Sequence, residues 1–216
     1  MALVGRTSDA RERLLEATID LVWPSSYGAV GVDAICERSG VKKGSFYHFF
    51  SSKDDLVIAA LEMHWESRRP IFDALFSPTR TPVERLRAYL AHGYERQKEI
   101  RAKHGRVLGC FHNSLGTECI QAHPHIAEKV QEVIASLRRY LESAMREGQA
   151  DGSIRKGDPA EDAKTMFAFV QGALLQARIY DDVELLRDLP RTGLALLGIE
   201  SAPSTKKKTD RRDARP

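Results

Sequence analysis

Residues 40–56, GVKKGSFYHFFSSKDDL, contain the pattern that decides the fold. Gly40 follows a short helix predicted for residues 32–38, because glycine tolerates the left-handed conformation that often ends a helix. Residues 42–49 predict a second short helix, and one of the two serines after it caps a long third one. Two short helices around a glycine-containing turn are typical of a helix-turn-helix, whose second helix enters the major groove of DNA.

Side chains suited to nucleic acid surround this second helix. Lys42 and Lys43 precede its N-terminus, where the backbone N–H groups already favour phosphate. The hydroxyl of Ser45 can donate to a phosphate or to the edge of a base, and Tyr47 and His48, one turn further on, reach the flanking DNA backbone. The sequence therefore predicts DNA contact at this helix.

The same residues resemble the TetR family of bacterial transcriptional regulators, whose pattern is roughly G-V-x-x-G-x-[LF]-Y-x-[YF]-F-x-x-K-x-x-L. The motif covers residues 8–60, and the helical remainder has the length of the family's ligand-binding domain. Val30 and Gly31 depart from the family, which usually has Ser or Thr there; glycine can still precede a helix but offers no side-chain hydrogen bond. The matching positions are Gly40, Val41, Gly44, Phe46, Tyr47, Phe49, Phe50, Lys53 and Leu56.

The resemblance implies roles for these residues. We expect Lys43, Ser45 and His48 to contact DNA at or near bases, and Tyr47 and Lys53 to bind phosphates. The three phenylalanines of the motif fall at core positions that hold the second helix in place. The expected DNA-binding set is Lys42, Lys43, Gly44, Ser45, Tyr47, His48 and Lys53.

Helical periodicity of apolar residues continues through the rest of the chain, and no run of alternating residues predicts a strand, so the fold class is all-α. We expect a helix-turn-helix DNA-binding domain at residues 8–53, a helical effector-binding and dimerisation domain at 54–199, and a disordered basic tail at 200–216. The other helices are predicted at residues 9–23, 53–76, 82–103, 107–122, 124–147, 159–180 and 183–197, the last interrupted at Pro190.

The charge of the chain is small and unevenly placed. There are 33 Lys and Arg against 30 Asp and Glu, a net charge of +3, and the last sixteen residues alone contribute +4 from 6 basic and 2 acidic side chains. The DNA-binding prediction therefore rests on local arrangement and not on net charge.

No apolar stretch approaches the roughly 20 residues of a membrane span, and the N-terminus does not have the pattern of a signal peptide. Three cysteines give no disulfide framework, so the expected compartment is the cytoplasm.

The apolar helix at residues 160–180 and the final helix ending near Leu197 are expected to form a homodimer. One helix-turn-helix reads few base pairs, so specificity needs two copies about one helical turn of DNA, roughly 34 Å, apart. The family resemblance assigns these two helices to a dimeric four-helix bundle. The alternative is that both are internal core.

The segment at residues 109–119, GCFHNSLGTEC, is the main feature outside the DNA-binding motif. It is similar to a G-C-x-x-x-x-L-x-x-E pattern in one TetR subgroup, which includes repressors of electrophile-detoxifying reductases whose matching cysteine senses electrophiles. The resemblance makes Cys110 a candidate effector or redox site, activated by a helix N-terminus and by His104 or Arg106. The alternative is a small packing residue. A Cys110–Cys119 disulfide is excluded in a continuous helix, along which the two lie about 13–14 Å apart.

No catalytic or metal-binding constellation accompanies these cysteines. Cys119, His123 and His125 are close in sequence, but Pro124 disturbs the helical spacing, and no metal or other cofactor is expected. There is no triad-like order, glycine-rich phosphate loop or carboxylate pair, so we do not expect an enzyme.

The sequence thus predicts a dimeric transcriptional repressor that binds operator DNA and is released by a small-molecule or electrophile effector. Two alternatives stay open: a DNA-binding architectural protein without a ligand, and a cysteine-dependent enzyme. An internal cavity would argue against the architectural protein. Its expected lining is Tyr94, Phe111, Tyr140 and Phe167.

Overall fold

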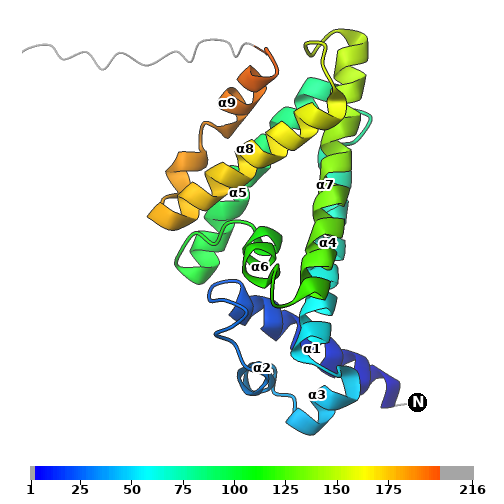
Figure 1. The fold of residues 1–216 in the computed structure, drawn as a ribbon, viewed down its shortest axis with the longest axis vertical. Coiled ribbons are helices and arrows are strands. Elements are labelled where there is room, and N and C mark those ends of the chain that lie inside the picture. Colours follow the sequence, from blue (N-terminus) through cyan, green and yellow to red (C-terminus); the bar gives the residue numbers. More distant parts are fainter. Residues whose placement is uncertain (1–2, 200–216) are drawn as a thin grey trace, which may run out of the picture.

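The computed structural model describes residues 3–199, which form nine α-helices and one short 3-10 helix and contain no β-strand (Figure 1). The all-α prediction is confirmed. The predicted basic tail, residues 200–216, lies outside the described residues. Three helices lie together at one end of the molecule (Figure 1): α1 (Leu3–Val22), α2 (Val32–Ser39) and α3 (Lys43–Phe49).

The ends of the short helices follow the local sequence signals. Gly31 precedes α2 without a side-chain hydrogen bond, and Gly40 ends α2 in the left-handed conformation at φ 66°. The next long helix, α4 (Lys53–Leu75), is capped by Ser52, whose hydroxyl accepts a hydrogen bond from the backbone N–H of Asp55. The α2–α3 turn therefore has the backbone geometry that the motif predicts.

The larger part of the chain is a helical bundle around two long helices. α4 packs beside α7 (Pro124–Asp151), and α8 (Pro159–Tyr180) crosses α7 diagonally (Figure 1). None of the described helices is long and apolar enough to cross a membrane. The remaining elements are α5 (Pro82–His104), α6 (Phe111–Cys119), the 3-10 helix η1 (Val183–Leu186) and α9 (Leu189–Leu196).

The helix predicted at residues 107–122 is shorter than expected. The side-chain amide of Gln97 donates to the backbone carbonyl of Gly109 at 3.0 Å and accepts from its N–H at 2.9 Å. Gly109 adopts φ 68°, so the chain arrives from α5 in a non-helical turn that these two bonds stabilise. As a result α6 begins at Phe111, and Cys110 precedes its first residue.

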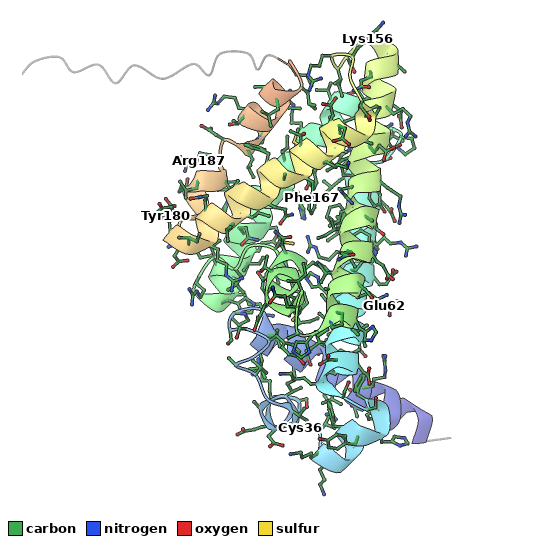
Figure 2. The ribbon with its side chains drawn as sticks, in the orientation of Figure 1. Cys36, Glu62, Lys156, Phe167, Tyr180 and Arg187 are labelled. Atoms are coloured by element: carbon green, nitrogen blue, oxygen red, sulfur yellow. The ribbon has the colours of Figure 1, made fainter. Side chains whose placement is uncertain are left out.

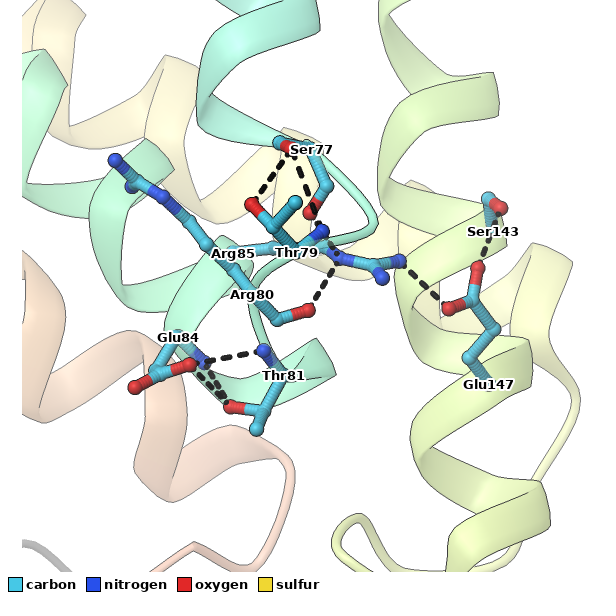
Figure 3. A network of polar contacts seen from close by, with 8 residues as sticks. All are labelled: Ser77, Thr79, Arg80, Thr81, Glu84, Arg85, Ser143 and Glu147. Atoms are coloured by element: carbon cyan, nitrogen blue, oxygen red, sulfur yellow. Dashed lines mark hydrogen bonds and ion pairs between the residues drawn. The ribbon is translucent and has the colours of Figure 1, made fainter.

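The start of α5 is fixed by a polar network (Figure 3). Thr81 and Glu84 form a capping box, in which each side chain accepts from the other residue's backbone N–H. The buried Arg85 guanidinium donates to the backbone carbonyls of Ser77 and Arg80, each at 3.0 Å, and to Glu147 of α7 at 2.7 Å. These bonds hold the α4–α5 turn against α7.

The helix-turn-helix shares its hydrophobic core with the bundle. Phe46 of α3 and Leu56 of α4 are completely buried, and they belong to the same apolar cluster as Phe111 and Leu115 of α6. A second cluster fills the space between α5, α7, α8 and α9. Because α6 contributes to the first cluster, its side chains pack in the same core as those of the helix-turn-helix.

Candidate nucleic-acid interface and effector cavity

Helix α3 presents one aromatic residue to solvent and buries another. The Phe46 ring has no exposed surface, whereas Tyr47 is 56% exposed, and the two rings meet edge to face at 5.0 Å between centroids. Phe50 is buried as well, and Arg11 of α1 lies over its ring at 5.4 Å. His48 is exposed. The phenylalanines therefore anchor α3 and leave Tyr47 and His48 available to a partner.

The start of α3 is open to solvent. Lys42, Gly44 and Ser45 are exposed, and a Cβ atom added at Gly44 would meet no atom within 4 Å. The ammonium of Lys43 pairs with the exposed carboxylate of Asp33 in α2 at 2.7 Å. An exposed pair of this kind is weak and is readily exchanged for a phosphate. The predicted contact residues at the start of α3 thus lie on one accessible surface.

Lys53 is placed differently from the other six residues of the predicted set. Its ammonium donates to the backbone carbonyls of Tyr27 at 3.0 Å and Val30 at 3.1 Å, and it lies 3.7 Å from the centre of the Tyr27 ring. These contacts fix the turn between α1 and α2. The sequence motif gave no indication of this internal role.

A carboxylate of α6 reaches the same turn. Glu118 accepts hydrogen bonds from the backbone N–H groups of Tyr27 and Gly28, both at 2.8 Å. The Tyr27 hydroxyl donates to Asp54, which also contacts Nδ1 of His123 at 2.9 Å. Burial acts to raise the pKa of Asp54, but these two hydrogen bonds hold it below its usual value. Four separate segments are therefore joined by charged and polar contacts at the base of the bundle.

The histidines near Cys119 do not gather around a possible metal. His123 contacts Asp54, and His125 contacts Glu128 at 3.3 Å on the surface of α7. Within residues 3–199, no group of three or more His, Cys, Asp or Glu side chains is placed to hold a metal ion.

A cavity of about 110 Å³ lies between α4, α5, α7, α8 and the start of α6. Its walls are mainly aromatic and aliphatic. Of the four residues expected to line a cavity, Phe111 does, but Tyr94, Tyr140 and Phe167 do not, because they lie on other faces of their helices. The lining is Trp23, His64, Trp65, Arg68, Phe72, Tyr89, His92, Gly93, Arg96, Gln97, Ile100, Gly109, Cys110, Phe111, His112, Leu137, Val170, Gln171 and Leu174.

Cys110 lies in the wall between this cavity and a neighbouring cleft of about 280 Å³. Burial raises the pKa of its thiol, although the backbone N–H groups of His112 and Asn113 act in the opposite direction. The expected activation by His104 or Arg106 is therefore wrong: the cation that lowers this pKa is Arg68, and burial outweighs it. All three cysteines are free thiols, and Cys119 is buried in the apolar cluster that contains Phe46 and Leu56.

The charged residues of the cavity were not predicted. Arg68 lies four residues after His64 on α4, and Arg96 lies four residues after His92 on α5. The Arg68 guanidinium contacts Nε2 of His92 at 2.7 Å, which joins the two helices across the cavity. The signal that could have indicated this charged lining in the sequence is the two i, i+4 pairs of a histidine and an arginine on otherwise apolar helix faces.

An exposed recognition helix on a bundle that contains a cavity defines the class of protein: a helix-turn-helix DNA-binding regulator with a ligand-binding domain. Residues 14–60 match the family described as bacterial regulatory proteins, tetR family, and residues 82–192 match the tetracyclin repressor-like C-terminal domain. The chain belongs to the TetR family of bacterial transcriptional regulators, as its motif predicted.

Characterised relatives cover most of the chain. It is similar to the transcriptional regulator AcuR of Cereibacter sphaeroides, at 29% identity over 85% of this chain and 83% of that protein. It is also similar to the transcriptional repressor NemR of Escherichia coli, at 26% identity over 83% of this chain and 89% of NemR. The crystal structure of the regulatory protein TetR from Rhodobacter sphaeroides has a TM-score of 0.75 and 28% identity, covering 85% of this chain and 96% of that one.

Proposed function

We propose that this protein is a homodimeric cytoplasmic repressor, which leaves its operator when a small molecule occupies the cavity beside Cys110. One observation carries the proposal: α6 begins in the wall of the cavity, and a side chain near its end bonds the turn between α1 and α2. Phe111 and His112 at its start line the cavity, and Glu118 near its end bonds the turn before α2. Helix α6 thus connects the two sites directly.

Occupation of the cavity is expected to displace the start of α6. Because Glu118 accepts from two backbone N–H groups of the α1–α2 turn, a shift of α6 moves that turn and strains the Lys53 contacts beside it. The effector must bind the displaced arrangement more tightly than the DNA-binding one, since equal affinity for both would shift nothing.

The dimer is supported by an exposed apolar surface on the last helices. Side chains of α8, η1 and α9 are 42–69% exposed although they are large and apolar, and Tyr180 lies at the outer edge of the molecule (Figure 2). Monomeric proteins rarely expose large apolar patches, and a second copy of the chain would cover these side chains. We define this dimer surface by Leu175, Ile179, Tyr180, Leu185 and Leu196.

The cavity also bears on the competing interpretations. An architectural DNA-binding protein has no need of a cavity lined by charged side chains, so this alternative is disfavoured. A cysteine-dependent enzyme needs a thiolate, and burial raises the pKa of Cys110. Release by an electrophile that reacts with Cys110 is a second candidate. Cys110 lines both the cavity and the neighbouring cleft, and the crystal structure of the relative NemR is described as a reduced form.

The test is a footprint of the purified protein on the DNA upstream of its own gene, followed by a screen of small molecules for release. Protection of two half-sites about one helical turn apart, roughly 34 Å, is expected. Absence of a protected site on that DNA and on a library of random sequences would contradict the proposal.

A further inference from the structure

The cavity gathers buried polar atoms that have no hydrogen-bond partner in the protein. In the part of the chain that the structure describes, six buried side-chain nitrogen and oxygen atoms lack a partner, and all six belong to residues of this cavity. Buried polar groups are almost always hydrogen-bonded, so such a concentration requires a physical reason. The atoms are Nε1 of Trp23, Nδ1 and Nε2 of His64, Nε of Arg96, Nε2 of His112 and Oε1 of Gln171.

The cavity also holds two cations without a buried counter-ion. Among residues 3–199, Arg68 makes no ion pair, and its hydrogen-bond partner is the neutral ring of His92. Arg96 pairs with Glu99 at 3.1 Å, but that carboxylate is mostly exposed, and Nε of Arg96 stays unpaired. Burial and the charge of Arg96 lower the pKa of Arg68 to about 10. Burying cations without an anion is costly, and a bound anion would offset that cost.

Two histidines of the cavity, His64 and His92, add neutral hydrogen-bond donors to its lining without adding positive charge. Burial and the neighbouring arginines lower the pKa of His64 well below its usual value and that of His92 to about 4. Each is therefore neutral near pH 7 and has one nitrogen that donates and one that accepts. Trp23 adds a further N–H, which can only donate.

The remaining walls of the cavity are apolar and leave little room. Trp65, Phe72, Tyr89, Phe111 and Leu137 surround the polar groups, and the cavity measures about 110 Å³. A dry engineered cavity of about 150 Å³ accommodates benzene, so an occupant confined to this cavity has few heavy atoms and an apolar part. A hydrated inorganic anion does not match such walls.

We propose that the cavity binds a small organic anion, a carboxylate on a short apolar body, with the carboxylate held by Arg68 and Arg96 and the body by the aromatic walls. This inference rests on the proposed function, in which the cavity is the effector site. The guanidinium groups provide charge-assisted hydrogen bonds, which are about twice as strong as neutral ones. Trp23 and His64 line the same cavity and offer N–H donors to the carboxylate, whereas the unpaired Oε1 of Gln171 can only accept a hydrogen bond.

The test measures binding to the purified dimer without DNA. Propionate, butyrate and benzoate are titrated by calorimetry, beside the matched amides propionamide, butyramide and benzamide and beside inorganic phosphate. We expect at least one carboxylate to bind and to raise the melting temperature, and its amide to bind about tenfold or more weakly. No binding by any carboxylate, equal binding by acid and amide, or equal binding by phosphate would overturn the proposal.

Variants locate the site. Arg68→Met and Arg96→Met are each expected to weaken carboxylate binding about tenfold or more, whereas Arg69→Met, on the exposed face of α4, leaves it unchanged. Arg68→Lys keeps the charge and is expected to retain part of the carboxylate affinity. It tests the same contact if a methionine variant fails to fold. An equal loss in Arg69→Met would contradict the assignment.

The two proposals fail differently. A carboxylate that binds with the expected dependence on Arg68 but does not release operator DNA supports the site and contradicts its role as the effector site. Release by a neutral molecule in both wild type and Arg68→Met supports the regulator and contradicts the anion.

Discussion

The carboxylate of Glu118 accepts a hydrogen bond from the backbone N–H of Tyr27 at 2.8 Å, although 91 positions separate the two residues in the sequence. It accepts a second from Gly28 at the same distance. A single side chain of α6 thus satisfies two donors of the turn that leads into the helix-turn-helix. This contact and the packing of Phe111 and Leu115 in the same core lie between the cavity and the helix-turn-helix, as the proposed release mechanism requires.

Glu118→Ala is expected to loosen this turn and uncouple release from effector binding. Leaving two backbone N–H groups without their charged acceptor costs about 1–3 kcal/mol of stability. Amide exchange at Tyr27 and Gly28 should accelerate, measured by NMR or mass spectrometry. The control is Glu128→Ala, which removes an exposed carboxylate of α7. Unchanged exchange at both amides would contradict the role of Glu118.

Tyr47→Ala is expected to weaken operator binding about tenfold or more with little loss of helicity. Tyr47 is 56% exposed, so its truncation removes few internal contacts, while a lost DNA contact costs about 1–3 kcal/mol. Affinity is measured by gel shift at fixed salt, and helicity by circular dichroism. Ile120→Ala, at a 60% exposed position beyond α6, is the control. Equal affinity of Tyr47→Ala and wild type would remove Tyr47 from the interface.

The helix-turn-helix could be predicted because its signals are local. The glycine after α2, the serine before α4 and the spacing of the aromatic residues each act within a few positions, and the structure confirms the helices they define. Lys53 shows the limit of this reasoning. Its partners, the carbonyls of Tyr27 and Val30, are brought to it only when α1 packs on α4.

The cavity could not be predicted because tertiary contacts create it. The sequence predicted a helix from residue 107, but the side chain of Gln97 binds the backbone of Gly109 and delays that helix until Phe111. This displacement places Cys110 in the cavity wall. The charged lining depends likewise on the register of α4 against α5, which brings Arg68 to His92.

Ile179→Glu is expected to convert the protein to a monomer. Ile179 is 64% exposed on α8 and belongs to the dimer surface, so a charge there would be buried without a partner on association. Sedimentation velocity measures the change, and operator affinity falls with it because the two half-sites are no longer read together. Ile120→Glu is the matched control. A dimeric Ile179→Glu protein would show that another surface makes the dimer.

His112 is expected to make the protein sensitive to acid. Burial lowers the pKa of this 5% exposed side chain to about 4, so the folded state keeps it neutral while the unfolded chain takes up a proton below about pH 6.5. The free energy of unfolding therefore falls between about pH 6.5 and 4, by up to about 3 kcal/mol. A hydrogen bond to the backbone of Leu61 acts to raise the pKa of His112, whereas the charge of Arg68 acts with burial to lower it.

The His112→Gln variant tests this dependence by denaturant titration at pH 7 and at lower pH. Its loss of stability on acidification should be smaller than that of wild type by about 1–3 kcal/mol, because glutamine does not titrate. His125→Gln, at an exposed position on α7, should leave the wild-type dependence in place. Identical pH profiles for wild type and His112→Gln would contradict the lowered pKa of His112.

Cys110 is expected to react with iodoacetamide more slowly near pH 7 than a free thiol, and to react faster as the pH rises. The thiolate is the nucleophile, and burial raises the pKa of this thiol, so the reactive fraction at neutral pH is small. Cys110→Ser identifies the site, since Cys36 and Cys119 are buried. A fast reaction at pH 7 would contradict the raised pKa of the Cys110 thiol. If, in addition, Cys110→Ser binds operator but is not released by electrophiles, Cys110 is the sensor.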